Sequence, residues 1–128
     1  MKNRNSEIEN RNWNDPSHIV ETERRVLRAL CQGTPQGAVR ATARDVLQAY
    51  RWREPVHQVV FDVVLNIPTD LAELVRSQLP ARLTRRGFPD VDIDDFFKPH
   101  QLSKGEAERL MRELRDQRSE VYTERRRS

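Results

Sequence analysis

Four aspartates between positions 90 and 95 have the spacing in this sequence that most resembles a chemical site. They alternate with apolar residues and are Asp90, Asp92, Asp94 and Asp95. Alternating carboxylates can hold a divalent cation, and the calcium loop of an EF-hand has Gly at its sixth position and Glu at its twelfth. Counted from Asp90, these two positions hold Asp95 and Gln101, so this is not an EF-hand loop. We expect Val91 and Ile93 to dock onto the core while the acids face water, and we expect no metal site.

The other residues that could do chemistry are not arranged for catalysis. The three histidines are far apart in sequence and do not form a His-Glu-x-x-His motif: His18, His57 and His100. The only cysteine, Cys31, lies among apolar residues, which predicts a buried thiol. The sequence contains neither a Gly-Lys-Ser/Thr phosphate loop nor a Gly-x-Ser-x-Gly motif. We therefore expect a protein that is not an enzyme, with no catalytic residue, cofactor or small-molecule substrate.

The arginines are the candidates for binding nucleic acid. The set consists of Arg40, Arg44, Arg82, Arg85 and Arg86. Such residues bind phosphates well when they gather on one face of the molecule. The net charge is only +3, and acids and bases alternate along most of the chain. Solvated helix faces therefore compete with a phosphate-binding surface, and nucleic acid is the alternative partner.

Composition indicates one small domain. The 128 residues are 36% hydrophobic and 34% charged, and the apolar residues are concentrated between Ile19 and Leu114. We expect a flexible lead at 1–16, a helical bundle domain at 17–122 and a basic tail at 123–128. The chain begins without the apolar run of a signal peptide, and no stretch approaches the roughly 20 apolar residues of a membrane span. These features predict a cytoplasmic protein with no membrane partner.

The first helix is expected over 17–32, after a cap and a proline supplied by residues 15–17. Its apolar side, at helical spacing, comprises Ile19, Val20, Val26, Leu27, Leu30 and Cys31. Its charged residues are expected to face water, with Glu21 pairing with Arg25, and comprise Glu21, Glu23, Arg24, Arg25 and Arg28. Gly33 and Pro35 are expected to end the helix.

A second helix is expected over 36–50. Its apolar stripe comprises Val39, Ala43, Val46, Leu47 and Tyr50. Its arginines are expected to point outward and are Arg40, Arg44 and Arg51.

The stretch 50–67 is the most apolar run and the expected centre of the core. Pro55 suits the first position of a helix, and the residues that follow are apolar on nearly all sides. Their β-branched types would also suit a strand, but the sequence offers no partner strand and no hairpin signal. We therefore predict a buried third helix.

Two more helices and a loop complete the expected fold. Asp70 and Glu73 predict a capping box for a helix whose stripe contains Leu71, Leu74, Val75 and Leu79, with a kink or restart at Pro80. The loop 87–100 is expected to fold back through Phe88, Phe96 and Phe97, with one helical turn at 94–98. Ser103 and Glu106 predict a capping box for the last helix. That helix, over 103–122, is the candidate partner-binding surface, through Leu110, Met111, Leu114, Val121 and Tyr122.

Two segments within about residues 19–67 carry a family resemblance. The first contains Glu21, Arg25, Val26, Leu27, Ala29 and Leu30, and the second contains Trp52, Pro55, His57, Phe61 and Leu65. Together they resemble the helical bundle shared by the N-terminal domain of bacterial replicative helicases and the C-terminal helicase-binding domain of bacterial primases. The resemblance implies that Trp52, His57, Phe61 and Leu65 define the fold and that the domain docks one protein onto another in DNA replication. No ATPase motif follows, which excludes a helicase.

These observations predict an all-α fold, a compact bundle of four to five helices with a flexible N-terminal lead and a charged C-terminal helix. The expected function is a non-catalytic protein–protein interaction module, with a protein partner or self-association. The alternative is a small nucleic-acid-binding or regulatory protein that uses its surface arginines.

Overall fold

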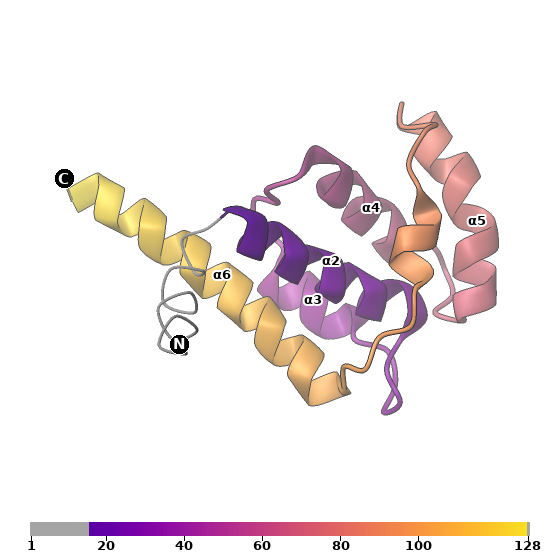
Figure 1. The fold of residues 1–128 in the computed structure, drawn as a ribbon, viewed down its shortest axis with the longest axis horizontal. Helices are drawn as coiled ribbons and strands as arrows, with labels where there is room; N and C mark the ends of the chain where they lie inside the picture. The colour runs from indigo at the N-terminus through magenta and orange to yellow at the C-terminus, as the bar shows by residue number, and fades with distance from the viewer. Residues whose placement is uncertain (1–15, 128) are drawn as a thin grey trace, which may run out of the picture.

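The computed structural model describes residues 16–127 of the chain, with side chains for 17–117. This part forms five α-helices and one 3-10 helix: α2 (Pro16–Gln32), α3 (Arg40–Val46), α4 (Pro55–Leu65), α5 (Ala72–Arg85), η1 (Ile93–Phe97) and α6 (Lys104–Arg127). Within it, the only β-type pairing is an isolated bridge between Thr34 and Gly37. The all-α bundle is therefore confirmed (Figure 1). The expected lead at 1–16 lies, but for Pro16, outside the described residues.

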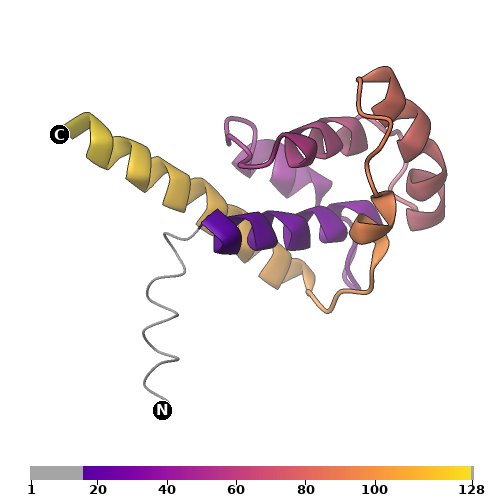
Figure 2. The ribbon, with the colours of Figure 1, turned by 45° about the horizontal axis from the view of Figure 1, so that its top comes forward.

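Helix α2 is the element around which the others pack. It contacts α4, α5, η1 and α6, whereas α3 packs on α6 and α4 packs on α5. Figures 1 and 2 show α2 crossing the middle of the bundle. The stretch 50–67 is deeply buried but contacts fewer elements. The centre of the fold is therefore α2, although 50–67 is the more apolar stretch.

The core confirms most of the expected apolar stripes. On α2 every predicted stripe residue is buried except the half-buried Val20, and the whole stripe predicted for the second helix is buried. The third helix is α4, and its inward side chains are His57, Val59, Val60, Phe61, Val63 and Val64. Burying a Val, Leu or Phe side chain fully contributes about 1.5–3 kcal/mol. The strand alternative for this run is wrong, because Pro55–Leu65 forms an α-helix.

Helix α3 is shorter at both ends than the expected 36–50. Residues 34–37 form a tight turn instead, in which the N–H groups of Thr34 and Gly37 donate to each other's carbonyl oxygens at 2.9 and 3.0 Å. Gly37 has a φ of 128°, a conformation that glycine adopts readily and other residues avoid. The helix therefore begins only at Arg40, and it ends at Val46.

The start of α5 differs from the prediction, because the Asp70–Glu73 capping box does not form. The residue that caps the helix is Leu71, which makes no side-chain cap bond, and Thr69 Oγ1 accepts the Leu71 N–H at 3.2 Å. The stripe continues inward through Val75, Leu79 and Leu83. Its first members are exposed instead, with Leu71 61% and Leu74 45% accessible.

The end of α5 is regular. The helix runs through Pro80 without a restart and stops at Arg85. Gly87, with a φ of 91°, lets the Phe88 N–H reach the Leu83 carbonyl at 2.9 Å, a glycine-terminated helix end. Beyond it Phe96 is buried, and Phe88 and Phe97 pack against the core, so the loop folds back as predicted and η1 is its helical turn.

The segment 28–42 runs beside 95–108 in the same direction. The side-chain contacts between them advance in step and join residues that are 64 to 68 positions apart. They are Arg28 with Asp95, Gln32 with Phe96 and Lys98, Gly33 with His100, Gln36 with Lys104, and Thr42 with Glu108. These contacts fix η1 and the start of α6 against α2 and α3.

Helix α6 starts with the predicted capping box. Glu106 N–H donates to Ser103 Oγ at 3.1 Å, and Ser103 N–H donates to Glu106 Oε1 at 3.0 Å. The helix then runs to Arg127, beyond the other helices in Figures 1 and 2, and includes most of the expected tail 123–128. In the part of the chain that the structure describes, no helix has the length and apolar character needed to cross a membrane.

Candidate functional site

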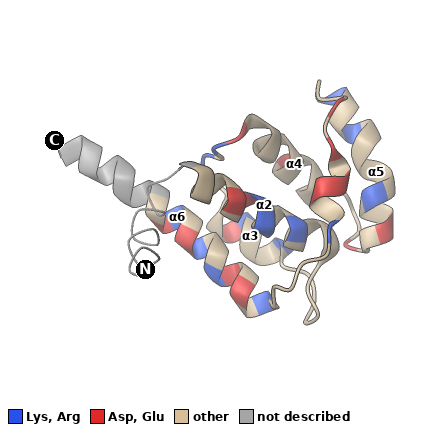
Figure 3. Cartoon of the chain, viewed as in Figure 1, with Lys and Arg blue, Asp and Glu red and all other residues tan. Residues whose placement is uncertain are grey.

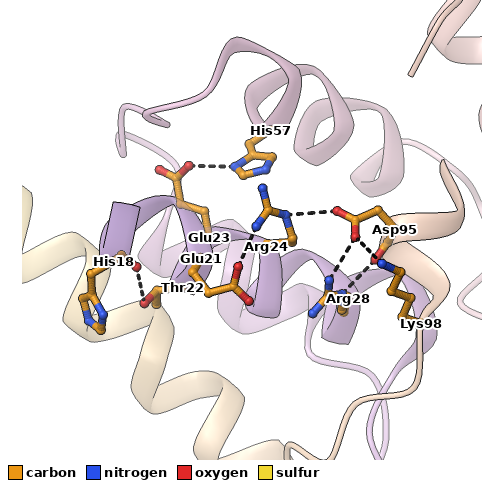
Figure 4. A network of polar contacts seen from close by, with 9 residues as sticks. All are labelled: His18, Glu21, Thr22, Glu23, Arg24, Arg28, His57, Asp95 and Lys98. Atoms are coloured by element: carbon orange, nitrogen blue, oxygen red, sulfur yellow. Dashed lines mark hydrogen bonds and ion pairs between the residues drawn. The ribbon is translucent and has the colours of Figure 1, made fainter. Parts of the chain in front are cut away.

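A cluster of ionisable side chains lies inside the bundle around Glu23. This residue is 0% exposed, so the prediction that it faces water is wrong. Its Oε2 accepts the hydroxyl of Tyr50 at 2.6 Å and the backbone N–H of Arg53 at 2.7 Å. Nδ1 of His57 lies 2.8 Å from Oε1 (Figure 4). The Glu23 cluster, defined as Glu23, Tyr50 and His57, therefore satisfies a buried carboxyl group with three partners.

Aromatic rings enclose the Glu23 cluster. The ring centroid of Trp52 lies 5.1 Å from that of Tyr50 and 4.9 Å from that of Phe61. Phe96 stands edge-on to His57 at 6.0 Å. Nε1 of Trp52 is buried, with no hydrogen-bond partner among the described residues. The Glu23, Tyr50 and His57 side chains are all buried, and their contacts join α2 to α4 and to the segment that precedes it.

Three of the residues that the family resemblance singled out as fold-defining lie in or beside the Glu23 cluster. Trp52, His57 and Phe61 are buried side by side, and Leu65 is half-buried against the core. The sequence did carry a signal for Glu23, which had been missed. It lies one turn after Ile19 and one turn before Leu27, in the middle of the buried stripe. A carboxyl group in that place requires donors from the facing helix.

A second polar cluster joins α2 to η1 through Asp95. Its carboxylate accepts Arg28 Nη2 at 3.0 Å, lies 3.0 Å from Arg24 Nε and lies 3.3 Å from Lys98 Nζ (Figure 4). The Asp95 cluster comprises these four residues. Burial raises the pKa of the Asp95 carboxyl. Hydrogen bonds from Arg28 and Lys98, together with the nearby arginine charges, lower it by more than burial raises it, so the pKa is below the usual value of 3.8.

The remaining aspartates of the loop behave as expected. Asp90, Asp92 and Asp94 are exposed, while Val91 and Ile93 pack against the core. Asp92 Oδ1 accepts the Asp94 N–H at 3.2 Å and so begins η1. No group of three or more His, Cys, Asp or Glu side chains among the described residues could hold a metal ion.

Arg40 and Arg44 bind the end of α4 rather than pointing freely outward. Arg40 is 9% exposed, and its Nη1 donates to the Ile67 carbonyl at 2.6 Å, so the prediction that it points outward is wrong. Burial lowers the pKa of Arg40, although the Asp70 charge opposes that shift. Nη2 of Arg44 donates to the carbonyl of Leu65. Both guanidinium groups thus bind carbonyls at or just past a helix C-terminus, where the helix dipole favours cations.

The other three arginines lie at the far end of α5. Arg82 Nη2 donates to Gln78 Oε1 at 3.1 Å, Arg86 lies 3.5 Å from Asp62, and Arg85 is exposed. Asp62 lies on α4 one turn before Leu65, whose carbonyl accepts Arg44, so Arg86 and Arg44 both contact the same helix. Figure 3 shows basic and acidic residues interleaved over the described helices. Four of the five candidate arginines thus contact groups within the chain, and acidic residues lie among them.

The candidate partner-binding residues of α6 fall into a buried group and a group whose side chains the structure does not describe. Leu110, Met111 and Leu114 are buried in the core of this chain, so they are not exposed to a partner. Val121 and Tyr122 lie outside the described side chains. Cys31 is also buried, and burial raises the pKa of its thiol to about 12, which leaves it unreactive at neutral pH.

A groove of about 500 Å³ lies between α2, the connection 99–102 and the first turns of α6. Its lining includes Glu21, Arg25 and Arg28 of α2 together with Glu106 and Arg109 of α6. His100 borders it in a fixed tautomer, since its Nε2 donates to the Gly33 carbonyl at 2.9 Å and its Nδ1 accepts the Leu102 N–H at 3.2 Å. This groove is the accessible concave feature that the sequence did not indicate, because its walls are more than 70 positions apart.

Comparison of the chain with protein-family models, with curated proteins and with solved structures finds no significant match.

Proposed function

We propose that the chain is a non-catalytic protein–protein interaction module, similar in role to the docking domain shared by bacterial replicative helicases and primases. The observation that carries the proposal is the exposed pair Leu71 and Leu74 at the start of α5. They are the two large hydrophobic residues most exposed in the described part. Leu71 lies one turn before Val75, the first residue of the buried stripe, and Leu74 directly precedes Val75. Apolar side chains left beside a complete core are typical anchors for a protein partner.

Two further features support a binding role over catalysis. The Glu23 cluster is buried beside aromatic rings, and its carboxyl group already has three polar partners. Helix α6 continues for 13 residues after Leu114, the last residue of the described core. A helical segment of that length is marginally stable in water by itself, and a partner would stabilise it.

The placement of the arginines gives less support to nucleic-acid binding. Arg40 and Arg44 already donate to backbone carbonyls, Arg82 donates to Gln78, and Arg86 is paired with Asp62. Binding to mixed-sequence DNA with a steep dependence on salt would favour this alternative.

The proposal is tested by pull-down from a lysate of the organism that encodes the chain, combined with light scattering of the purified protein. The bait is compared with a Leu71→Gln/Leu74→Gln variant, which keeps helix-forming side chains but removes the apolar pair. Glu73→Gln is the matched control, since Glu73 is exposed in the same turn. We expect a partner, or self-association, that the double variant loses and the control keeps. The proposal would be contradicted if the protein were a monomer and the pull-down captured no protein whose binding is lost in the double variant.

A further inference from the structure

The groove between α2 and α6 combines an apolar floor with a charged rim. Leu102 and Leu110 line it and are almost completely buried, so they form the floor. The rim carries three guanidinium groups and two carboxylates. At about 500 Å³ the groove has the size of sites that hold a small ligand or a few side chains of a peptide.

Most charges on this rim are already paired. Glu21 accepts Arg24 at 2.5 Å, Glu106 accepts the Ser103 N–H at 3.0 Å, and Arg28 is held by Asp95 at 3.0 Å. Arg109 donates to Glu113 at 2.7 Å through one of its nitrogens. Glu21, Arg28 and Arg109 are thus each paired with an opposite charge, whereas Glu106 is hydrogen-bonded to neutral groups of Ser103.

Arg25 is the exception. It is exposed and forms no hydrogen bond or ion pair with another described side chain. It lines the groove together with Arg109 of α6. A guanidinium group with open donors can bind a carboxylate through two parallel hydrogen bonds.

We propose that this groove receives an acidic side chain of a partner polypeptide, with Arg25 binding its carboxylate and the floor of Leu102 and Leu110 receiving an adjacent apolar side chain. The inference rests on the proposed interaction function and specifies the chemistry of the partner. The two rim carboxylates favour a peptide over nucleic acid, because they would repel a row of phosphates. A peptide places a single carboxylate at Arg25 and keeps its other side chains clear of Glu21 and Glu106.

The test is a titration of the ¹⁵N-labelled full chain with the peptide acetyl-Ala-Leu-Ala-Asp-Leu-Ala-amide, followed by NMR. A second peptide with Asn in place of the Asp is the chemical control. We expect amide shifts at 25–28 and 100–110 with the acidic peptide, and binding at least about tenfold weaker for the neutral one. Arg25→Ala should weaken binding of the acidic peptide by a similar factor, and Arg25→Lys should restore only part of it.

Arg85→Ala is the matched variant, because Arg85 is also an exposed helical arginine without an ion-pair partner among the described residues. It should leave peptide binding unchanged. Thermal melts of both alanine variants check that each folds. Absence of shifts at millimolar peptide, shifts that ignore Arg25, or tighter binding of inorganic phosphate or a short DNA duplex at these amides would overturn the proposal.

The outcome separates this inference from the function on which it rests. If the leucine pair retains a partner but the acidic peptide does not bind, the groove proposal fails and the interaction module stands. If the peptide binds in an Arg25-dependent way but no partner depends on the leucines, the role of Leu71 and Leu74 fails instead. Failure of both experiments removes both proposals.

Discussion

Neighbouring residues of α2 serve two polar clusters that differ in almost every physical respect. Glu23 points toward α4 and reaches His57 and Tyr50, whereas Arg24 points toward η1 and reaches Asp95 (Figure 4). The Glu23 cluster is dry and its carboxyl group accepts from a hydroxyl and a backbone amide as well as contacting an imidazole. The Asp95 cluster is half-exposed, and its carboxylate is held by three cationic side chains.

The two clusters show that the number of charges in a cluster does not determine how much it contributes to the stability of the fold. A hydrogen bond in a dry site is strong, and losing one partner leaves another polar group buried and unsatisfied. An ion pair that water can reach is screened and contributes little by comparison. We therefore expect the cluster with fewer charges to contribute more to the stability of the fold.

The largest effect is expected for Glu23→Ala. The change leaves the Tyr50 hydroxyl, the Arg53 N–H and His57 without their acceptor and also creates a cavity. We expect a loss of about 3–5 kcal/mol in the free energy of unfolding, measured by urea denaturation. Glu23→Gln is the control, since its amide oxygen keeps one acceptor, and it should cost clearly less. A loss below about 1 kcal/mol for Glu23→Ala would show that the cluster contributes little to the stability of the fold.

Tyr50→Phe should have an intermediate effect. It removes one donor to Glu23 while keeping the ring that packs on Trp52 at 5.1 Å. The expected loss is about 1–3 kcal/mol, because a buried acceptor loses a partner. Urea denaturation measures it, and near-UV circular dichroism should show unchanged aromatic packing. If the spectrum changes with the stability, the hydroxyl is not the cause.

Asp95→Asn should reduce stability by only about 1 kcal/mol near neutral pH. Because the folded-state pKa of Asp95 lies below its usual value of 3.8, its contribution is present above that value and is lost as the pH falls through the lower folded-state pKa. The wild type should therefore lose more stability than the variant when the pH drops from about 5 to about 3. Asp90→Asn, at an exposed position, should follow the wild type. Parallel curves for Asp95→Asn and the wild type would refute this account.

The smallest expected effect is the dependence of the two stability losses on salt concentration. Raising NaCl from about 0.05 M to about 1 M should shrink the Asp95→Asn difference by a few tenths of a kcal/mol, because the Debye length falls from over 10 Å to about 3 Å. The Glu23→Ala difference should stay constant, since ions do not enter a dry site. If salt changed the stability losses of the two variants equally, the proposed difference between the clusters would be wrong.

Local signals predicted much of the fold. Pro55, Gly33 and the pair Ser103–Glu106 each act within one helical turn, and the ends that they predict agree with the structure. Where a neighbour intervened, the prediction failed. Residues 34–37 closed a turn and shortened α3, and Thr69 bound the Leu71 N–H in place of an Asp70–Glu73 box.

The sites could be predicted less well, because each depends on contacts between distant residues. Glu23 looked like part of a charged face, and its burial follows from donors about 30 positions away. Arg40 looked like a surface cation until the Ile67 carbonyl came within reach. The groove has walls from 21–28 and 99–110, and the pattern of a single helix does not show that they meet.

The parallel contacts between 28–42 and 95–108 have a consequence for synthesis. Their separations of 64 to 68 residues mean that α2 and α3 leave the ribosome long before the segment that covers them. Until about residue 114 has emerged, the parts of these two helices that α6 covers remain open to solvent and to chaperones. Closing so long a loop is an entropic barrier that local helix formation does not lower. The nascent chain therefore completes its core in one late step, when Leu110, Met111 and Leu114 arrive together.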